Sequence, residues 1–198
     1  MAITSNVSGF LQQVRQGVRP NMFQVDITFP DGTGGDAELA SFMCKSAALP
    51  ASNVGVIEVP FRGRTVKIAG DRTFDNWTAT FINDKDMKIR SYFEKWLEQI
   101  NTHQANTAGI IDPTAYGRSV MIRQLEKDSS DNGSELRSYK LWYAFPTSAS
   151  AIDLAYDSND QIAEFTVEWQ YSFFTAGNGE TARATGAAQG AGSARNVV

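Results

Sequence analysis

The chain has 198 residues, a formal net charge of −4 and 42% hydrophobic residues. This length and apolar content fit one domain with extensions and a sizeable core, and they argue against a disordered chain. The acidic balance argues against a general nucleic-acid binder, because phosphate contacts require a basic surface.

Neither the N-terminus nor the cysteine content points to secretion or to a membrane. The N-terminus lacks the basic and apolar regions of a secretory signal, and no apolar run approaches the ~18–20 residues that span a bilayer. Cys44 is the single cysteine, so the chain has no internal disulfide framework. We therefore expect a soluble protein made in a reducing cytoplasm, with no membrane partner.

The first expected element is a short amphipathic helix within residues 6–18, where apolar residues recur at helical intervals. These residues are Val7, Phe10, Leu11, Val14 and Val18. Pro20 then ends the helical pattern. We assign residues 1–21 to an N-terminal arm that carries this helix.

A strand is predicted at residues 22–29, where apolar and polar residues alternate strictly. Residues 30–36 supply the Pro, Asp and Gly residues of a turn. We expect residues 38–45 to form the second strand of this hairpin. The glycines of residues 32–35 lack the Gly-Lys-Ser/Thr sequence of a phosphate-binding loop, so the turn interpretation is preferred.

A second hairpin is predicted further along the chain. Residues 54–61 and 64–69 are rich in β-branched residues and flank the dipeptide Arg62-Gly63. A two-residue connection that ends in glycine, between two such runs, is typical of a β-hairpin.

The middle of the chain predicts a strand and then a helix. Residues 73–82 alternate around Trp77, whose side chain we place in the core. About residues 85–100 predict the one long amphipathic helix of the chain. Its apolar stripe consists of Ile89, Phe93, Trp96, Leu97 and Ile100. Residues 101–116 are expected to form an irregular connection.

Two more strands are predicted at residues 120–125 and 138–145, around a polar turn at residues 128–133. This turn resembles the start of a calcium-binding loop. However, the twelfth position of such a loop is Tyr139 here instead of a bidentate Glu, so the hairpin turn is preferred. Residues 146–160 are expected to form a longer loop.

The most strongly patterned segment is residues 161–174, which predicts one strand longer than the usual strand. Its polar face includes Glu164 and Glu168. Its apolar face is expected to lie in the core, because an amphipathic strand of this kind needs a second layer. The expected core residues are Phe165, Trp169 and Phe173 from this segment, together with Trp77, Phe93 and Trp96.

These elements together predict a mainly β domain at residues 22–175. We expect an antiparallel β-sandwich or partly closed barrel of about seven or eight strands with one flanking α-helix, at about residues 85–100. Residues 176–198 are rich in Gly and Ala and lack apolar periodicity, so we assign them to a C-terminal tail.

The sequence offers no catalytic constellation, metal site or cofactor motif. His103 is the sole histidine, and no nucleophile motif such as G-x-S-x-G accompanies it. One His and Cys44 fall short of the ligands that zinc requires. Glu164 and Glu168 lie about 13–14 Å apart by strand rise, too far for the carboxylate pair of a glycosidase. We therefore expect no enzyme activity.

A family resemblance rests on residues 59–84 and on the helix that follows. The central block contains Val59-Pro-Phe-Arg-Gly-Arg-Thr, Asn76-Trp77-Thr78 and Phe81-Ile82-Asn83-Asp84, and the helix contains Ile89-Arg90, Phe93-Glu94 and Trp96. Arg19-Pro-Asn-Met-Phe23, Ala144-Phe-Pro146 and the final aromatic strand add to it. Across roughly residues 15–175 the chain resembles the tail tube proteins of contractile-tailed bacteriophages. The Gly/Ala-rich tail and residues 101–117 depart from that resemblance.

The resemblance implies a structural virion protein. Such proteins form hexameric rings that stack into the inner tail tube, inside a sheath and between baseplate and tail terminator proteins, and DNA passes through the lumen without specific binding. The virion tail would be assembled in the host cytoplasm. In this setting we expect Phe61, Arg62, Gly63 and Arg64 to form a hairpin tip that contacts a neighbouring subunit, the alternative being a solvated surface turn. We also expect Glu164 and Glu168 to face an acidic lumen, since like charge disfavours phosphate binding.

Two other functions remain open at this level. The tube proteins of type VI secretion systems share the implied architecture, and the sequence does not separate them from a phage tail. A non-enzymatic β-barrel binding module would need aromatic and cationic residues on one exposed face. The aromatic residues here alternate with Glu, Thr and Ser, where a core is expected. We further expect the 176–198 tail to pack on adjacent subunits or beneath the sheath.

Overall fold

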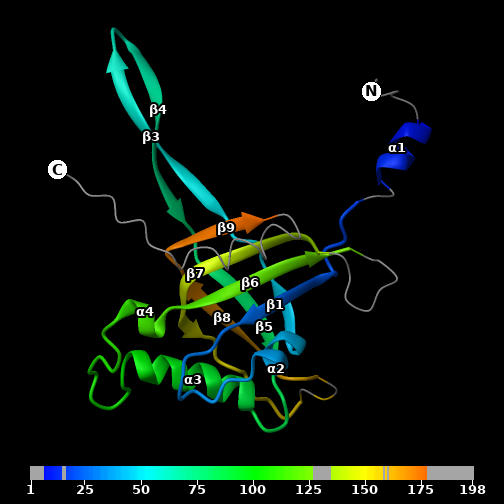
Figure 1. Cartoon of the computed structure of the whole chain (residues 1–198), viewed down its shortest axis with the longest axis vertical. Coiled ribbons are helices and arrows are strands. Elements are labelled where there is room, and N and C mark those ends of the chain that lie inside the picture. The colour runs from blue at the N-terminus through cyan, green and yellow to red at the C-terminus, as the bar shows by residue number, and fades with distance from the viewer. Residues whose placement is uncertain (1–6, 15–16, 127–134, 158, 160, 178–198) are drawn as a thin grey trace, which may run out of the picture.

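The computed structural model describes residues 7–14, 17–126, 135–157, 159 and 161–177, and these form nine strands and four helices (Figure 1). The helices are α1 (Val7–Val14), α2 (Ala37–Phe42), α3 (Lys88–Ile100) and α4 (Pro113–Tyr116). The strands are β1 (Phe23–Ile27), β2 (Cys44–Ala47), β3 (Ser52–Phe61), β4 (Arg64–Phe74), β5 (Trp77–Ile82), β6 (Arg118–Leu125), β7 (Glu135–Ala149), β8 (Glu164–Gln170) and β9 (Phe173–Gly177). The expected mainly β, antiparallel architecture is confirmed.

Seven of the strands form one antiparallel sheet, and its centre is the 15-residue strand β7. The strand order is β1-β6-β7-β8-β5-β2, and β9 also pairs with β7. The first part of β7 pairs with β6 and β9, whereas its second part pairs with β8, with a register shift between Pro146 and Ser148. One long strand therefore joins two parts of the sheet. Because β1 and β2 remain edge strands in the described chain, the barrel is not closed.

The core lies between the two parts of the sheet and helix α3, which crosses below them in Figure 1. Trp77, Phe93, Trp96, Phe165 and Trp169 are each 1% exposed or less. The ring of Trp169 meets those of Phe93 and Trp96 edge-on, with centroids 5.6 and 5.2 Å apart. Such edge-to-face pairs add about 0.5–1.5 kcal/mol each beyond the burial of their area. The stripe of α3 thus supplies one wall of the core, as its periodicity predicts.

The indole N–H groups of the buried tryptophans on β5 and α3 are satisfied by backbone carbonyls. Trp77 Nε1 donates to the carbonyl of Ala48 at 2.6 Å, and Trp96 Nε1 donates to the carbonyl of Tyr116 at 3.0 Å. Buried donors without partners are costly, so these bonds tie β2 and α4 to the core. Helix α4 lies within the connection that we expected to be irregular.

The prediction of a hairpin between residues 22–29 and 38–45 is wrong. Asp36 accepts hydrogen bonds from the backbone N–H groups of Glu38 and Leu39, at 3.0 and 3.2 Å, and thereby caps helix α2. Strand β2 then pairs with β5, and β1 pairs with β6. Asp36 therefore begins a helix, and the turn residues before it do not form a β-hairpin.

The prediction of one continuous strand at residues 161–174 is also wrong. The chain leaves β8 at Tyr171 and Ser172, where the N–H of Ser172 donates to the carbonyl of Trp142 at 3.1 Å, and β9 then pairs with the first part of β7. This change of partner shifts the alternation by one residue. Phe173, which we expected in the core, is 41% exposed and stacks on Trp142, whereas Phe174 packs against the core.

Candidate functional site

The most unusual surface of the molecule is the β3–β4 hairpin, which extends away from the sheet in Figure 1. Its turn consists of Arg62 and Gly63, whose φ angles are 46° and 81°. Two consecutive positive φ angles correspond to a type I′ turn, whose twist matches that of the two strands. Glycine adopts this conformation without steric cost, and the X-Gly signal therefore identified the turn correctly.

The two faces of the hairpin differ in chemistry. On one face, directly opposed pairs are Ile57 with Ile68, Val59 with Val66, and Phe61 with Arg64. On the other face, Glu58 lies opposite Lys67 and Pro60 lies opposite Thr65. Opposed residues of an antiparallel pair share one face. The hairpin is therefore amphipathic, and we call the face with Ile57, Val59, Phe61, Val66 and Ile68 its apolar face.

The apolar face has no covering layer within the described chain. Its five hydrophobic side chains are between 42% and 62% exposed, and every residue of β3 is exposed. A two-stranded hairpin is marginally stable in water by itself, and a contiguous exposed apolar surface marks an interaction site. The outer backbone edges of β3 and β4 are also available for strand pairing. This face is thus built to be covered by another molecule.

The tip of the hairpin adds positive charge to the apolar face. The guanidinium of Arg62 lies over the ring of Phe61, 5.3 Å from its centroid, and Arg64 lies opposite Phe61. Glu58 and Lys67 form an exposed ion pair at 3.5 Å, which contributes little to stability. The tip therefore presents one aromatic ring and two guanidinium groups. The tip residues were predicted from the sequence, whereas the apolar face formed by Ile57, Val59, Val66 and Ile68 was not, although these residues alternate with polar ones in the sequence.

Glu164 and Glu168 lie on the face of β8 that points away from the core, between β5 and β7. Glu168 is exposed and lies opposite Thr78 on β5 and Ser148 on β7. The carboxylate of Glu164 instead accepts two hydrogen bonds from Lys45 Nζ, at 2.6 and 2.7 Å. This face is rich in hydroxyl groups. Glu168 supplies a negative charge on this face, and it forms no ion pair with any described residue.

The hydroxyl groups of this face bond to one another and to the backbone. The hydroxyls of Thr80 and Thr166 lie 3.0 Å apart, and the hydroxyl of Ser150 accepts from the N–H of Thr166 at 2.9 Å. These bonds satisfy the polar groups without involving the core. The face is consequently mostly polar; its hydrophobic members among the opposed pairs are Ile82, opposite Glu164, and Phe145, opposite Gln170.

The remaining reactive residues do not form a chemical site. Burial raises the pKa of the Cys44 thiol to about 12. His103 pairs with Glu98 on the exposed end of α3. No group of three or more metal-ligating residues occurs in the part of the chain that the structure describes, and none of its helices there has the length and apolarity to cross a bilayer. The turn at residues 128–133 lies outside the described residues.

The chain is similar in sequence to known tail tube proteins. A family model described as phage tail tube protein matches residues 18–176. The chain is 37% identical over 149 residues to the tail tube protein gp19 of Enterobacteria phage T4, covering 75% of this chain and 85% of gp19. It is 28% identical over 174 residues to the tail tube protein of Serratia phage KSP90, covering 86% of this chain and 95% of that protein.

Two solved structures share the fold. One is a chain of the anti-feeding prophage cap, described as a tube terminating cap, with a TM-score of 0.58, 21% identity, and coverage of 90% of this chain and 99% of that chain. The other belongs to the extended sheath-tube complex of the PVC extracellular contractile injection system. It has a TM-score of 0.54, 17% identity, and coverage of 88% of this chain and 99% of that chain. At these identities the likeness concerns the fold alone.

Proposed function

The chain belongs to the phage tail tube protein family, and we propose that its β3–β4 hairpin joins copies of the chain into the stacked rings of the tube. It is a tail tube protein of a contractile phage tail and thus a component of the virion. The observation that carries the proposal is the uncovered apolar face of the hairpin. The role is structural and non-enzymatic, since the chemistry of the site is that of a contact surface.

The hairpin stabilises assembly because a neighbouring copy buries what this copy leaves exposed. Full burial of a Val, Ile or Phe side chain is worth about 1.5–3 kcal/mol relative to full exposure. The five side chains of the apolar face are about half exposed, so covering them recovers about half of that value each. Repeated around a ring, for which we propose six subunits, contacts of this size give a closed and specific assembly.

The hydroxyl-rich face of β8 is the proposed wall of the channel. Glu168, exposed between Thr78 and Ser148, places a negative charge at each repeat of the wall. Phosphates are repelled by this charge, so DNA passes without adhering. Glu164 belongs to the same face, but its charge is neutralised by Lys45. An assembled structure with both side chains on the outer surface would reject this assignment.

The partners we propose follow from the position of a tube in a contractile tail. A sheath protein covers the outside of the tube, and baseplate and tail terminator proteins bind its two ends. The solved relatives come from a tube terminating cap and a sheath-tube complex, which supports such partners for this fold. We further propose that assembly takes place in the host cytoplasm and that the C-terminal residues 176–198 add contacts to adjacent subunits or to the sheath. Deleting residues 178–198 should then weaken assembly.

The experiment that tests the hairpin proposal removes the hairpin and leaves the sheet unchanged. Residues 57–68 are replaced by Asn-Gly, which forms a type I′ turn between the opposed residues Val56 and Ala69. Negative-stain microscopy of the unmodified protein should show rings or tubes of uniform diameter, whereas the shortened variant should remain folded and unassembled. Tubes of normal appearance from the shortened variant would refute the proposal.

A further inference from the structure

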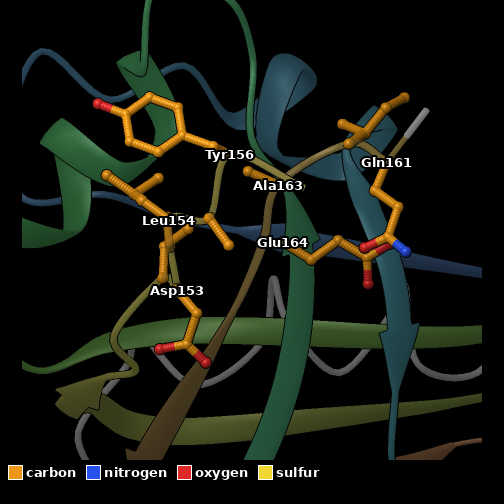
Figure 2. A pocket seen from close by; sticks show the side chains of 9 residues that line it. Asp153, Leu154, Tyr156, Gln161, Ala163 and Glu164 are labelled. Atoms are coloured by element: carbon orange, nitrogen blue, oxygen red, sulfur yellow. The ribbon is translucent and has the colours of Figure 1, made fainter. Parts of the chain in front are cut away.

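The loop between β7 and β8 forms a surface pocket of about 840 Å³. Asp153, Leu154, Tyr156 and Ile162 are among the residues that line it, and Figure 2 shows the side chains of the first three. The loop lies beside α2 and α3, at the end of the molecule opposite the hairpin tip (Figure 1). No residue of the proposed channel wall other than Glu164 contributes to it.

The pocket is apolar and acidic. Leu154, Tyr156 and Ile162 are 91%, 107% and 69% exposed, which is unusual for three large apolar side chains that line one pocket. The carboxylates that line the pocket are Asp153 and Glu164, and the sequence of residues 150–164 contains two more Asp and no Lys or Arg. Glu164 is already paired with Lys45, whereas Asp153 makes no ion pair with any described residue. The pocket therefore suits a ligand that is both apolar and cationic.

The hairpin tip has this complementary chemistry. It presents the ring of Phe61 with the guanidinium groups of Arg62 and Arg64, and neither arginine forms an ion pair with the described residues. We propose that the hairpin tip of one copy docks into the pocket of a second copy, with Phe61 against Leu154 and Tyr156 and the arginines near Asp153 and Asp157. This inference rests on the proposed role of the hairpin and names the surface that receives it.

The placement of the two surfaces determines the type of contact. Because tip and pocket lie at opposite ends of one chain, a single copy cannot bring them together (Figure 1). Two different patches that meet between identical copies form a heterologous contact, which repeats along a line or around a ring. Opposite ends of the longest axis favour repetition along that axis, which corresponds to the stacking of successive rings. Opposite charges at the contact also fix its polarity and accelerate encounter.

Charge reversal tests the pairing. One variant carries Arg62→Glu and Arg64→Glu, a second carries Asp153→Lys and Asp157→Lys, and a third carries all four changes. We expect each reversed pair alone to raise the concentration needed for tube formation at least about tenfold, because like charges then meet at the contact. The third variant, and an equimolar mixture of the first two, should recover tubes.

A control variant reverses charges elsewhere on the surface. Lys95→Glu with Glu98→Lys changes the same number of charges on α3 and should leave assembly unchanged. Tube formation by the Asp153→Lys, Asp157→Lys variant at the normal concentration would overturn the inference, and so would failure of the folded four-fold variant to recover. If the hairpin variant fails to assemble while the loop variant assembles normally, the hairpin has another receptor, and the proposed function stands without this inference.

Cysteine cross-linking provides a second readout that does not depend on charge. Oxidation of tubes that carry Arg62→Cys and Leu154→Cys should yield a ladder of covalent oligomers on a non-reducing gel. Arg62→Cys alone, and Arg62→Cys with Glu98→Cys, should yield none. A ladder from the Glu98→Cys control with none from the Leu154→Cys pair would contradict the proposed pairing.

Discussion

Replacing Phe61 with alanine should impair assembly without impairing folding. The side chain is 62% exposed on the apolar face of the hairpin, so the isolated subunit loses little when the ring is removed. Surface substitutions of this kind usually change stability by no more than about 0.5 kcal/mol. In the tube, the same ring would be covered by a neighbouring copy.

The magnitude follows from the exposed fraction. Burying a whole Phe side chain is worth about 1.5–3 kcal/mol, and the 62% that is still exposed corresponds to about 1–2 kcal/mol per contact. A difference of this size is a factor of about 5–30 in an equilibrium constant. The concentration at which tubes form should therefore rise by about the same factor, whereas the melting temperature of the subunit should stay within about 2 °C.

The matched comparison is Phe165→Ala, the same chemical change at a side chain that is 1% exposed. This substitution should cost about 3–5 kcal/mol of folding stability. For a domain of this size it should lower the melting temperature by about 6–20 °C. Sedimentation measures assembly and circular dichroism measures melting. Two results would refute the proposed role of Phe61: a loss of melting temperature in Phe61→Ala as large as that in Phe165→Ala, or unchanged tube formation by Phe61→Ala.

Three further predictions concern residues outside the hairpin. Glu168→Lys should make assembled tubes retain DNA in co-sedimentation, in a salt-sensitive way, because it places a cation in the channel wall. Glu168→Gln should retain less DNA, and equal retention by the two variants would count against the placement of Glu168 in the wall. Burial raises the pKa of the Cys44 thiol to about 12. Labelling of this thiol by a thiol-reactive reagent at about pH 8 should therefore be at least about tenfold slower in the native protein than in denaturant, and equal rates would contradict the burial of Cys44. The N–H and the hydroxyl of Thr114 donate to Asp112 and hold the pKa of its carboxyl below the ordinary 3.8, so its contribution to stability should be present above that value and lost as the pH falls through the folded pKa. An NMR titration of Asp112 that gives an ordinary or raised pKa would disprove the last prediction.

The sequence predicts those parts of the fold in which local pattern and tertiary partner agree. Trp77 and Trp169 lie opposite each other in the sheet, and the alternation around each of them predicts the strand and the buried face correctly. The apolar stripe of α3 predicts both the helix and its contact with the sheet. The Arg62-Gly63 dipeptide predicts the type I′ turn because only certain residues tolerate its backbone angles.

The errors occur where long-range pairing decides the structure. Nothing in the sequence near Ser172 indicates that the chain changes partners there, from β5 and the second part of β7 to the first part of β7. The exposure of Phe173 follows from that change. The pairing of β2 with β5 is likewise non-local. The cap at Asp36, by contrast, was visible in the sequence, because Asp before a helical segment is a common N-cap.

The candidate site was partly accessible from the sequence. The turn chemistry located the tip, Phe61 to Arg64, but burial decides whether a β-branched run lies inside a sheet or on an unpartnered hairpin. Ile57, Val66 and Ile68 would be equally suited to a core strand. The acidic pocket near Leu154 depends on the conformation of the long loop between β7 and β8. The hydrophobic periodicity of a sequence predicts helices and strands but not the conformation of such a loop.

A cryo-EM reconstruction of the assembled protein tests the central claim most directly. We predict that the apolar face of every β3–β4 hairpin, from Ile57 to Ile68, is covered by a neighbouring copy. A reconstruction in which the hairpins remain exposed to solvent, with the copies joined only through other surfaces, would contradict it.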